Sequence, residues 1–499
     1  MKMQLLSAGE YHEKTGYFRN RISPHHLDFD AYPLAFKAYE TLERIGLPTV
    51  FSQQDRPLLT LFSSGPGKGR LDIAAVSHIL FLAYGVTSVT RSRSIPILNR
   101  TLPSAGGLYP CHLYVAISGI EGLETGVYYF DPVHFCLCRL HGTYAPRDVD
   151  TVCFMVTASF YTSAWKYRER AFRYMLLDAG HLVENLDLAL GLYDVDHTLC
   201  YDFEDRAISD FLQLDPSQEV PLVCVSSGRD MNVSAMGLAG NPGKPADPSP
   251  EFSFSTDRKR PVQYEILSQI HSLGKIVKPD RPFPLPEITQ KKGLGPVAVP
   301  MKPPPMEGGQ GFVDSVLLRR SRRNFVQETL PVRTWSALMN TIFCSLCFDA
   351  SRPAARALDF LSMGMICQNL ENLDDGCYFF SRNPSKMQLM EKGRFARAFA
   401  GICLDQEWIK AAGINFLFMA NLEDLEKAFG ARGYRYVMFY AGRIAQRIYL
   451  AAQGLGLGCC GVGALYDGEA KALLGLNRTS VLLYAVAAGP IKKTRGHEI

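Results

Sequence analysis

"RAFRYMLLDAGHLVENLDLALGL", residues 170–192, is the stretch that decides the fold of this chain. Apolar residues recur in it at helical spacing, which predicts a long helix with one face in a core. That face consists of Phe172, Met175, Ala179, Val183, Leu186 and Leu190. A glycine in mid-helix costs about 1 kcal/mol of helix propensity. The pair Ala179–Gly180 therefore indicates close packing against a neighbouring helix.

Residues 432–454, "RGYRYVMFYAGRIAQRIYLAAQG", repeat this pattern without a gap. Identical pairs include Arg170 and Arg432, Tyr174 and Tyr436, and Gly180 and Gly442. Strand-like stretches repeat too, as "GVYYFDP" (126–132) and "GCYFFSR" (376–382), each after a helical run. The sequence therefore predicts a duplication of one α+β domain, an internal pseudo-dimer with a largely antiparallel central sheet and flanking helices in each copy.

Length and composition set the domain plan. The chain has 499 residues, 47% of them hydrophobic and 20% charged, which fits a globular protein of two or three domains. We expect an N-terminal extension (1–60), a first domain (61–228), a Pro/Gly-rich connector (229–311) and a second, diverged domain (312–499). A short helical piece is expected inside the connector, at residues 263–276.

Charge and hydropathy exclude some classes of partner. The formal net charge of +4 gives no support for a nucleic-acid partner. No signal peptide and no apolar run of membrane-spanning length is evident, so we expect a cytoplasmic protein without a membrane partner. The scattered cysteines predict reduced, buried side chains and no metal site. The chain is expected to be a monomeric pseudo-dimer or to form a further homodimer.

An arginine-rich segment opens the second copy. In "SVLLRRSRRNF" (315–325), guanidinium groups can bind phosphate oxygens as forks while a hydroxyl adds a donor. The candidates for such a phosphate site are Arg319, Arg320, Ser321 and Arg323. The alternative is a solvated basic turn. The first copy reads "LLTLFSSGPGKGR" (58–70) at this place and lacks the arginine cluster, so only the second copy can hold a phosphate in this way.

Two glycine-rich stretches differ between the copies. "PSAGGLYP" (103–110) suits either a tight turn or a backbone that lies against a flat ligand. "GLGLGCCGVGAL" (454–465) is predicted to be a loop packed edge-on against a ring. The corresponding stretches "PAARALDF" (353–360) and "GLYDVDHTL" (191–199) have lost the glycine runs. Each copy has thus kept what the other lost, which predicts one composite site.

Several motifs together resemble one family. "YHEKTGY" (11–17), "PSAGGLYP", "LETGVYYFDP" (123–132) and "WKYRERAFRYMLLDAGHLVENL" (165–186) are similar to the SagB/ThcOx-type dehydrogenases of the nitroreductase superfamily. The resemblance covers about residues 10–225, and a more diverged nitroreductase-like copy covers about 312–492. It implies a nitroreductase-like fold, duplicated here in one chain, and FMN bound where the family has two subunits.

The resemblance also implies the cofactor-binding residues. Arg319, Ser321 and Arg323 would hold the FMN phosphate, and Arg320 would lie near the ribityl chain. The implied residues along the isoalloxazine are Pro103, Ser104, Ala105, Gly106 and Gly107, with Gly461, Val462 and Gly463 at its edge. Because the motifs are complementary between the copies, we expect one FMN per chain.

Catalysis is expected to belong to the first copy. In azoline-oxidising members of the family a Lys-Tyr pair precedes the long helix, and the match here is Lys166-Tyr167. A lysine desolvated beside a flavin can have its pKa lowered towards ~7–8 and act as a base. An exposed cation at the start of a helix is the alternative for Lys166.

The expected function is FMN-dependent oxidation of a small molecule or modified peptide carrying an azoline, with hydride transfer to flavin N5 and Lys166/Tyr167 as acid/base pair. No peptide-binding or cyclodehydratase module is evident, which leaves the substrate open. The alternatives are an NAD(P)H-dependent reductase of nitro or quinone compounds and a flavin-binding protein without turnover.

Overall fold

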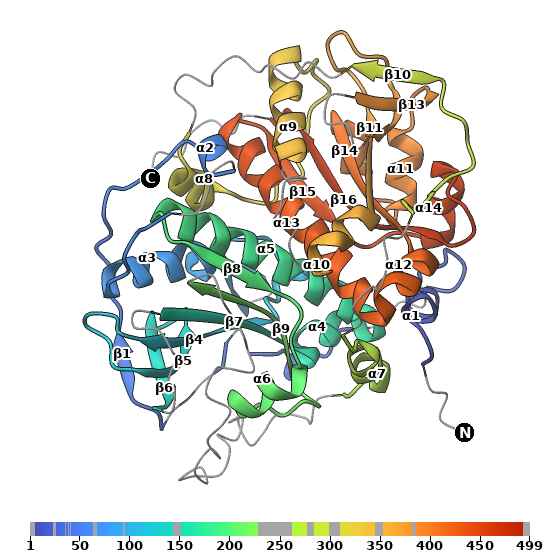
Figure 1. The fold of residues 1–499 in the computed structure, drawn as a ribbon. Helices are drawn as coiled ribbons and strands as arrows, with labels where there is room; N and C mark the ends of the chain where they lie inside the picture. The colour runs from blue at the N-terminus through green and yellow to red at the C-terminus, as the bar shows by residue number, and fades with distance from the viewer. Residues whose placement is uncertain are drawn as a thin grey trace. The chain divides into compact units, whose positions relative to one another are not determined.

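The computed structural model describes residues 5–22, 26–34, 36, 37, 39, 41–62, 67–92, 95–142, 151–227, 262–276, 284–298, 310–344, 353–381 and 386–492. The chain divides into two compact units. Unit 1 comprises Met1–Leu5, His25–Arg56 and Ser63–Ile276, and unit 2 comprises Leu6–Pro24, Pro57–Phe62 and Val277–Ile499. Each unit has its own sheet and its own helices (Figure 1).

The sheet of unit 1 is antiparallel throughout. Its strand order is β1-β6-β5-β4-β7-β9-β8. The strands are β1 (Arg44–Gly46), β4 (Cys111–Ser118), β5 (Gly126–Asp131), β6 (Cys136–His141), β7 (Thr151–Ser159), β8 (His197–Cys200) and β9 (Glu219–Ser227). A separate two-stranded ribbon, β2 (Val86–Ser92) with β3 (Ile95–Arg100), leads into the Pro103–Pro110 loop.

The sheet of unit 2 is also antiparallel and has the order β10-β13-β12-β11-β14-β16-β15. The strands are β10 (Gly295–Ala298), β11 (Leu361–Cys367), β12 (Gly376–Phe380), β13 (Lys386–Lys392), β14 (Ile414–Asn421), β15 (Gly458–Val462) and β16 (Ser480–Gly489). Strand for strand, this is the topology of unit 1. The predicted duplication of an α+β domain with an antiparallel sheet is therefore confirmed.

The main helices repeat in the same order relative to the strands, although unit 2 contains further helices. Those of unit 1 are α3 (Ile73–Tyr84), α4 (Phe160–Tyr167), α5 (Ala171–Leu192), α6 (Asp205–Phe211) and α7 (Glu265–Leu273). Those of unit 2 are α1 (Ala8–Lys14), α2 (Leu58–Phe62), α8 (Phe312–Leu318), α9 (Val332–Cys344), α10 (Pro353–Arg356), α11 (Ala396–Ile402), α12 (Leu422–Phe429), α13 (Gly433–Gly454) and α14 (Asp467–Leu474). The two repeated stretches of sequence form the long helices α5 and α13.

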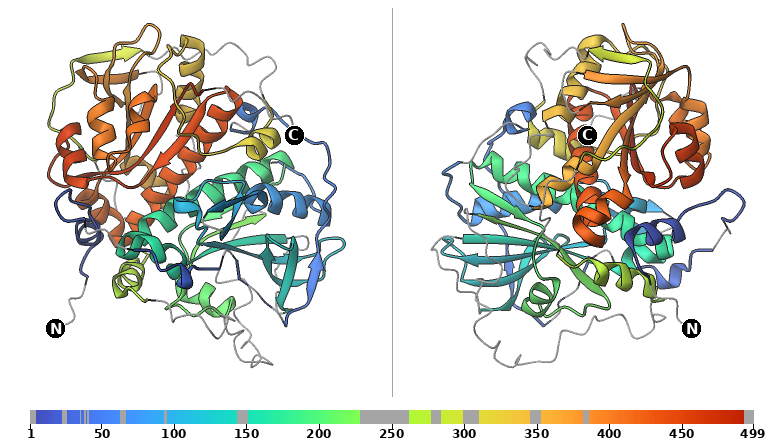
Figure 2. Two further views of the ribbon diagram at one scale, coloured as in Figure 1. Left: turned by 180° about the vertical axis from the view of Figure 1, so that it is seen from behind. Right: turned by 45° about the vertical axis from the view of Figure 1, so that its right-hand side comes forward.

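Both faces of each sheet are covered. Neighbouring strand residues point to opposite faces, yet the strands β4, β7 and β9 are buried along nearly their whole length. In unit 1, α5 packs on one face and α6 on the other (Figures 1 and 2). In unit 2, α13 covers one face while α11 and α14 close a core against the other. Because both faces are covered, the central strands and the long helices consist largely of apolar residues.

The expected N-terminal extension, 1–60, is divided between the units. Helix α1 belongs to unit 2, where His12 Nδ1 lies 3.0 Å from the Tyr434 hydroxyl. Arg19 forms ion pairs of 2.9 Å with both Asp405 and Glu469. By contrast, strand β1 extends the sheet of unit 1 by pairing with β6. The sequence pattern alone does not indicate this division, because these contacts join residues that are far apart in the sequence.

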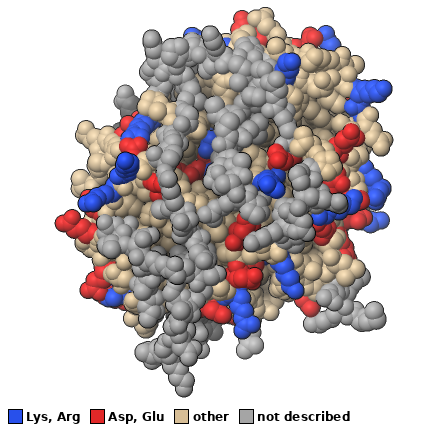
Figure 3. Space-filling view, in the orientation of Figure 1, with Lys and Arg blue, Asp and Glu red and all other residues tan. Residues whose placement is uncertain are grey.

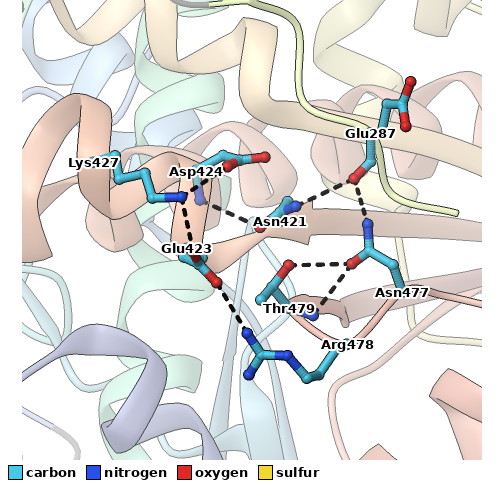
Figure 4. A network of polar contacts seen from close by, with 8 residues as sticks. All are labelled: Glu287, Asn421, Glu423, Asp424, Lys427, Asn477, Arg478 and Thr479. Atoms are coloured by element: carbon cyan, nitrogen blue, oxygen red, sulfur yellow. Dashed lines mark hydrogen bonds and ion pairs between the residues drawn. The ribbon is translucent and has the colours of Figure 1, made fainter.

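The expected connector, 229–311, is also more than a linker. Its stretches 229–261, 277–283 and 299–309 lie outside the described residues. The predicted short helix forms as α7 in unit 1, and β10 is the edge strand of the second sheet. Figure 4 shows one anchor in unit 2, where the main-chain oxygen of Glu287 accepts hydrogen bonds from the side-chain amides of Asn421 (3.2 Å) and Asn477 (2.6 Å).

The described part of the face in Figure 3 is mixed in charge, with Lys/Arg and Asp/Glu side chains interspersed over it. Among the described helices, none has both the length and the apolar character needed to cross a bilayer.

Candidate functional site

The glycine-containing loop of unit 1 is a tight turn. A short 3₁₀ turn spans Ala105–Gly107, and Gly107 N–H donates to the Ser104 carbonyl at 3.1 Å. Gly106 and Gly107 have φ values of +67° and +68°, in the left-handed region that favours glycine. Both glycines are thus required by the backbone conformation, as the turn interpretation of the sequence predicts.

The turn lies against the predicted catalytic pair. A Cβ placed on Gly106 would be 2.9 Å from the Tyr167 hydroxyl and 3.1 Å from Lys166 Nζ. Both side chains are half-buried at the end of α4. The Tyr167 ring packs on Tyr174 of α5, with centroids 4.2 Å apart. The structure therefore brings Gly106, Lys166 and Tyr167 together within unit 1; we call them, with Tyr174, the lysine cluster.

Asp178 holds the same loop and was not predicted as a site residue. Its carboxylate accepts hydrogen bonds from the Ser104 hydroxyl and, at 3.3 Å, from Ala105 N–H. The side chain comes from α5 and is 4% exposed. Burial raises its pKa to about 7, although both hydrogen bonds favour the charged form. An acidic residue within an apolar helical pattern was the available signal.

The predicted phosphate-binding residues follow helix α8 in unit 2. The Arg319 side chain is buried, with its guanidinium 5.6 Å from the ring centre of Tyr449. Arg320 donates to the carbonyls of Leu317 (2.9 Å) and Arg319 (2.7 Å), so it caps the C-terminal end of α8. Ser321 and Arg323 are exposed. Arg320 thus contacts the main chain of its own segment, and Arg319, Ser321 and Arg323 are the better candidates for binding an anionic ligand.

Tyr449 of α13 joins this segment to the glycine-rich stretch. Its hydroxyl accepts from Gly461 N–H at 2.6 Å and lies 3.1 Å from the Ser321 hydroxyl. Arg322 N–H also donates to the Cys459 carbonyl at 2.9 Å. The residues Arg319, Ser321, Arg323, Tyr449 and Gly461 thus form one group in unit 2, which we call the arginine cluster. Tyr449 was missed because its partners are distant in sequence.

The prediction of a loop over 454–465 was wrong. Residues Gly458–Val462 form the edge strand β15, paired with β16; Gly463 follows that strand. A Cβ on Gly461 would lie 1.8 Å from the Tyr484 hydroxyl, and one on Gly458 would lie 2.2 Å from a methyl group of Ile491. These glycines therefore make room for the side chains of Tyr484 and Ile491.

Among the described residues, Asp131, Cys136 and Cys138 form a buried set of potential metal ligands. The Asp131 carboxylate already accepts from the backbone N–H groups of Val133 (2.9 Å) and His134 (3.1 Å). Burial raises the pKa of the Cys138 thiol to about 12 and also raises that of Cys136, so both favour the neutral thiol. This hairpin is accounted for by its own hydrogen bonds.

Comparison with known proteins gives the family. The model of the nitroreductase family matches residues 383–490. The chain is 30% identical over 174 residues to MJ1384 of Methanocaldococcus jannaschii, which is named as a nitroreductase; the match covers 32% of this chain and 81% of that protein. It is 28% identical over 136 residues to the trifolitoxin-processing protein TfxB of Rhizobium leguminosarum bv. trifolii, covering 24% of this chain and 36% of TfxB.

The fold is shared with a solved structure from Anabaena variabilis, also named as a nitroreductase. The TM-score is 0.74 at 24% identity, over 97% of this chain and 99% of the other. This match confirms the fold over both copies. The sequence relatives confirm the resemblance based on the motifs: the chain belongs to the nitroreductase family.

Proposed function

We propose that this protein is an FMN-dependent oxidoreductase that oxidises an azoline in a small molecule or modified peptide. Membership of the nitroreductase family supports an oxidoreductase. The observation that carries the finer proposal is the contact of the Gly106 turn with Lys166 and Tyr167, because it groups a backbone without side chains with a potential base and a hydroxyl donor.

The residues present fit FMN. Its phosphate is a dianion, and the arginine cluster offers the guanidinium groups of Arg319 and Arg323 with the hydroxyl of Ser321. Its flat ring requires a surface without protruding side chains, which the glycine turn supplies. The prediction from the sequence assigns FMN one set of residues, taken from both copies. The members of that set are Pro103, Ser104, Ala105, Gly106 and Gly107 in unit 1, and Arg319, Ser321, Arg323, Gly461, Val462 and Gly463 in unit 2.

Ser321 is prepared to donate a hydrogen bond. Burial raises the pKa of Tyr449 well above its usual value, so the phenol keeps its proton. The Tyr449 oxygen accepts from Gly461 N–H and lies 3.1 Å from the Ser321 hydroxyl, to which Tyr449 would donate its proton. The Ser321 hydroxyl then keeps its proton for a phosphate oxygen. Three charge-assisted bonds of this kind contribute roughly 5–9 kcal/mol, which is close to the ~8 kcal/mol of micromolar binding.

Lys166 and Tyr167 would handle the proton of the reaction. Bound FMN supplies the acceptor, at N5, for the hydride that leaves the substrate carbon. Lys166, in its unprotonated form, would take the proton from the atom next to that carbon, which would leave a double bond in the substrate ring. Tyr167 donates a hydrogen bond that orients the substrate. The packing of Tyr167 on Tyr174 limits the motion of its hydroxyl.

A reductase of nitro or quinone compounds is a second candidate, supported by the similarity to MJ1384. In that reaction NAD(P)H supplies the hydride. The two candidates can be separated with one preparation of the purified chain. The flavin is first identified after release from the protein. Anaerobic protein is then mixed with NAD(P)H, and separately with a peptide containing a thiazoline.

Bleaching of the flavin absorbance by the thiazoline peptide, with formation of a thiazole, is the result that we expect. Fast bleaching by NAD(P)H and turnover of a nitroarene, without oxidation of the peptide, would favour the reductase. A protein that binds no FMN even after reconstitution would contradict both functions.

A further inference from the structure

Asp178 is tied to the glycine turn by both of its oxygens. One accepts from the Ser104 hydroxyl and the other from Ala105 N–H. Ser104 in turn accepts from Tyr109 N–H at 2.9 Å, so one hydroxyl links the carboxylate to both ends of the loop. Asp178 is buried, at 4% exposed, while Ser104 and Ala105 are half-buried. Hydrogen bonds to a buried carboxylate are strong, and their loss is costly.

The loop needs such a restraint. Gly106, Gly107 and Tyr109 all have positive φ, and Tyr109, at +51°, is not a glycine. A non-glycine residue in this region costs about 1–2 kcal/mol, and it persists only where surrounding contacts impose it. Tyr109 is also fixed from its far side, because its hydroxyl accepts from Arg100 N–H at 3.1 Å. Asp178 supplies the restraint on the other side, next to Gly106.

Helix α5 contacts both the Gly106 turn and the Lys166–Tyr167 pair. Tyr174 packs on Tyr167, and Asp178 lies one turn further along the same helix. Residues four apart share a helix face. The spacing between the Gly106 turn and the Lys166–Tyr167 pair is therefore set by two side chains from one rigid element.

The second copy provides an internal comparison. Position 440 corresponds to Asp178 and is a tyrosine, and position 354 corresponds to Ser104 and is an alanine. That copy has also lost the glycine pair, while Tyr436 is kept at the position of Tyr174. Both partners of the hydrogen bond are thus absent from the copy that lacks the turn. This pattern links Asp178 to the turn and not to the stability of the helix.

We propose that Asp178 is the positioning residue of the candidate site: its carboxylate fixes the Ser104–Tyr109 loop so that Gly106 stays against Lys166 and Tyr167. The proposal rests on the proposed function in that the turn is taken to face FMN. Asp178 itself touches neither substrate nor cofactor in this role. It acts through the loop, so its loss changes the geometry of the turn first and the chemistry second.

Hydrogen exchange on the protein without FMN tests the first part. In Asp178→Asn, the amide can still accept from Ala105 N–H, but its NH₂ group gives the Ser104 hydroxyl no acceptor. We expect exchange of the loop amides of residues 105–109 to become at least about tenfold faster. The matched control is Asp187→Asn on the same helix, which removes a carboxylate paired with His197 at 2.6 Å. This control should leave the loop unchanged.

A double-mutant cycle tests whether the bond itself is responsible. Asp178→Asn and Ser104→Ala break the same interaction, so the double variant should be no worse than the poorer single variant. Ser104→Thr keeps the hydroxyl and should restore slow exchange, because the extended backbone at this position (φ −137°, ψ 145°) accepts a β-branched residue. FMN affinity and kcat/KM should follow the exchange rates across the series.

Unchanged exchange in Asp178→Asn would overturn the proposal, as would additive effects of the two single variants. Faster exchange with wild-type FMN affinity and kcat/KM would also overturn the positioning role. Failure of the proposed function would be seen separately, as wild-type protein that binds no FMN. The exchange experiment needs neither cofactor nor substrate.

Discussion

The end of α4 in unit 1 and the end of α12 in unit 2 are the same structural corner with different chemistry. In each unit a short helix ends, a 3₁₀ turn follows (Arg168–Arg170 or Gly430–Arg432), and the long helix begins. In unit 1 the short helix ends with Lys166-Tyr167, whereas in unit 2 it ends with Ala428-Phe429. Phe429 packs on Tyr436 as Tyr167 packs on Tyr174. Aromatic packing is thus kept in both copies, while the amine and the hydroxyl are kept in one.

The backbone of the two corners is also alike. Arg168 and Gly430, which correspond in sequence, both have positive φ, at +50° and +60°. A glycine adopts this conformation freely, whereas an arginine is strained there. The buried arginines Arg170 and Arg432 follow in both copies. The fold therefore needs an aromatic pair, a left-handed residue and a buried arginine at this corner, and it does not need the lysine. This contrast supports the proposed catalytic role of Lys166.

Among the changes that test this comparison, replacement of Lys166 is expected to have the largest effect on substrate oxidation. Lys166→Ala gives unit 1 the alanine found in unit 2, so the fold and FMN binding should survive. Substrate oxidation should fall by ~10²–10⁴-fold, the usual contribution of a positioned acid or base. Lys166→Arg should not rescue it, because a guanidinium stays protonated. Steady-state turnover and flavin content measure the two effects.

The matched control for that prediction is Lys427→Ala. Lys427 is exposed at the end of the corresponding helix and pairs with Glu423 at 2.8 Å. We expect turnover to be unchanged. Normal turnover in Lys166→Ala together with loss of FMN would make Lys166 a cofactor ligand and would contradict its role as the base.

Gly106→Ala separates contact from backbone strain. Its new Cβ would lie 2.9 Å from Tyr167 Oη and 3.1 Å from Lys166 Nζ, so the pair must shift. A misplacement of this size can cost roughly 10²-fold in turnover. Gly456→Ala is the control, because Gly456 has φ +69° and its Cβ would meet nothing within 4 Å. Both variants carry the backbone strain, and we expect only Gly106→Ala to lose activity. Equal losses would show that strain alone matters.

Arg319→Ala and Arg323→Ala should each weaken FMN binding by ~1.5–3 kcal/mol, which is about a ten- to hundredfold change in Kd. Each variant removes a charged donor from the arginine cluster, which has no counterpart in the first copy. Arg478→Ala is the control, since that side chain is 88% exposed. Titration of apoprotein with FMN gives the three constants. The same weakening at all three positions would point to a general effect of charge.

Asp178 should also make a smaller contribution of its own to the pH dependence of stability. Burial raises the pKa of Asp178 from 3.8 to about 7, so between these values the folded state binds more protons than the unfolded state. The free energy of unfolding should therefore fall as the pH rises through this window. Asp178→Asn removes the group, so denaturant unfolding of this variant should lack this part of the slope. Parallel pH profiles for both proteins would contradict the proposed burial.

Much of this fold was predictable because its signals are local. Helical periodicity located α5 and α13, and their similarity predicted the duplication. The strand β15 was missed because its glycines accommodate Tyr484 and Ile491, which come from a neighbouring strand and the chain beyond it. Asp178 carries a local signal, yet its partner Ser104 lies 74 residues away. Such pairs can be recognised only in the three-dimensional structure. Tyr449 of the arginine cluster was missed in the sequence for the same reason.

The most direct test of the account is the ratio of FMN to protein. In the proposed function the two copies contribute different FMN-binding residues, so we expect the reconstituted chain to hold one FMN. Quantitation of the released flavin against protein measured by amino-acid analysis gives this ratio. A ratio near one is the predicted result. A ratio near two would mean that each copy binds FMN by itself, and a ratio near zero would mean that the two clusters serve another ligand; either result would contradict the account.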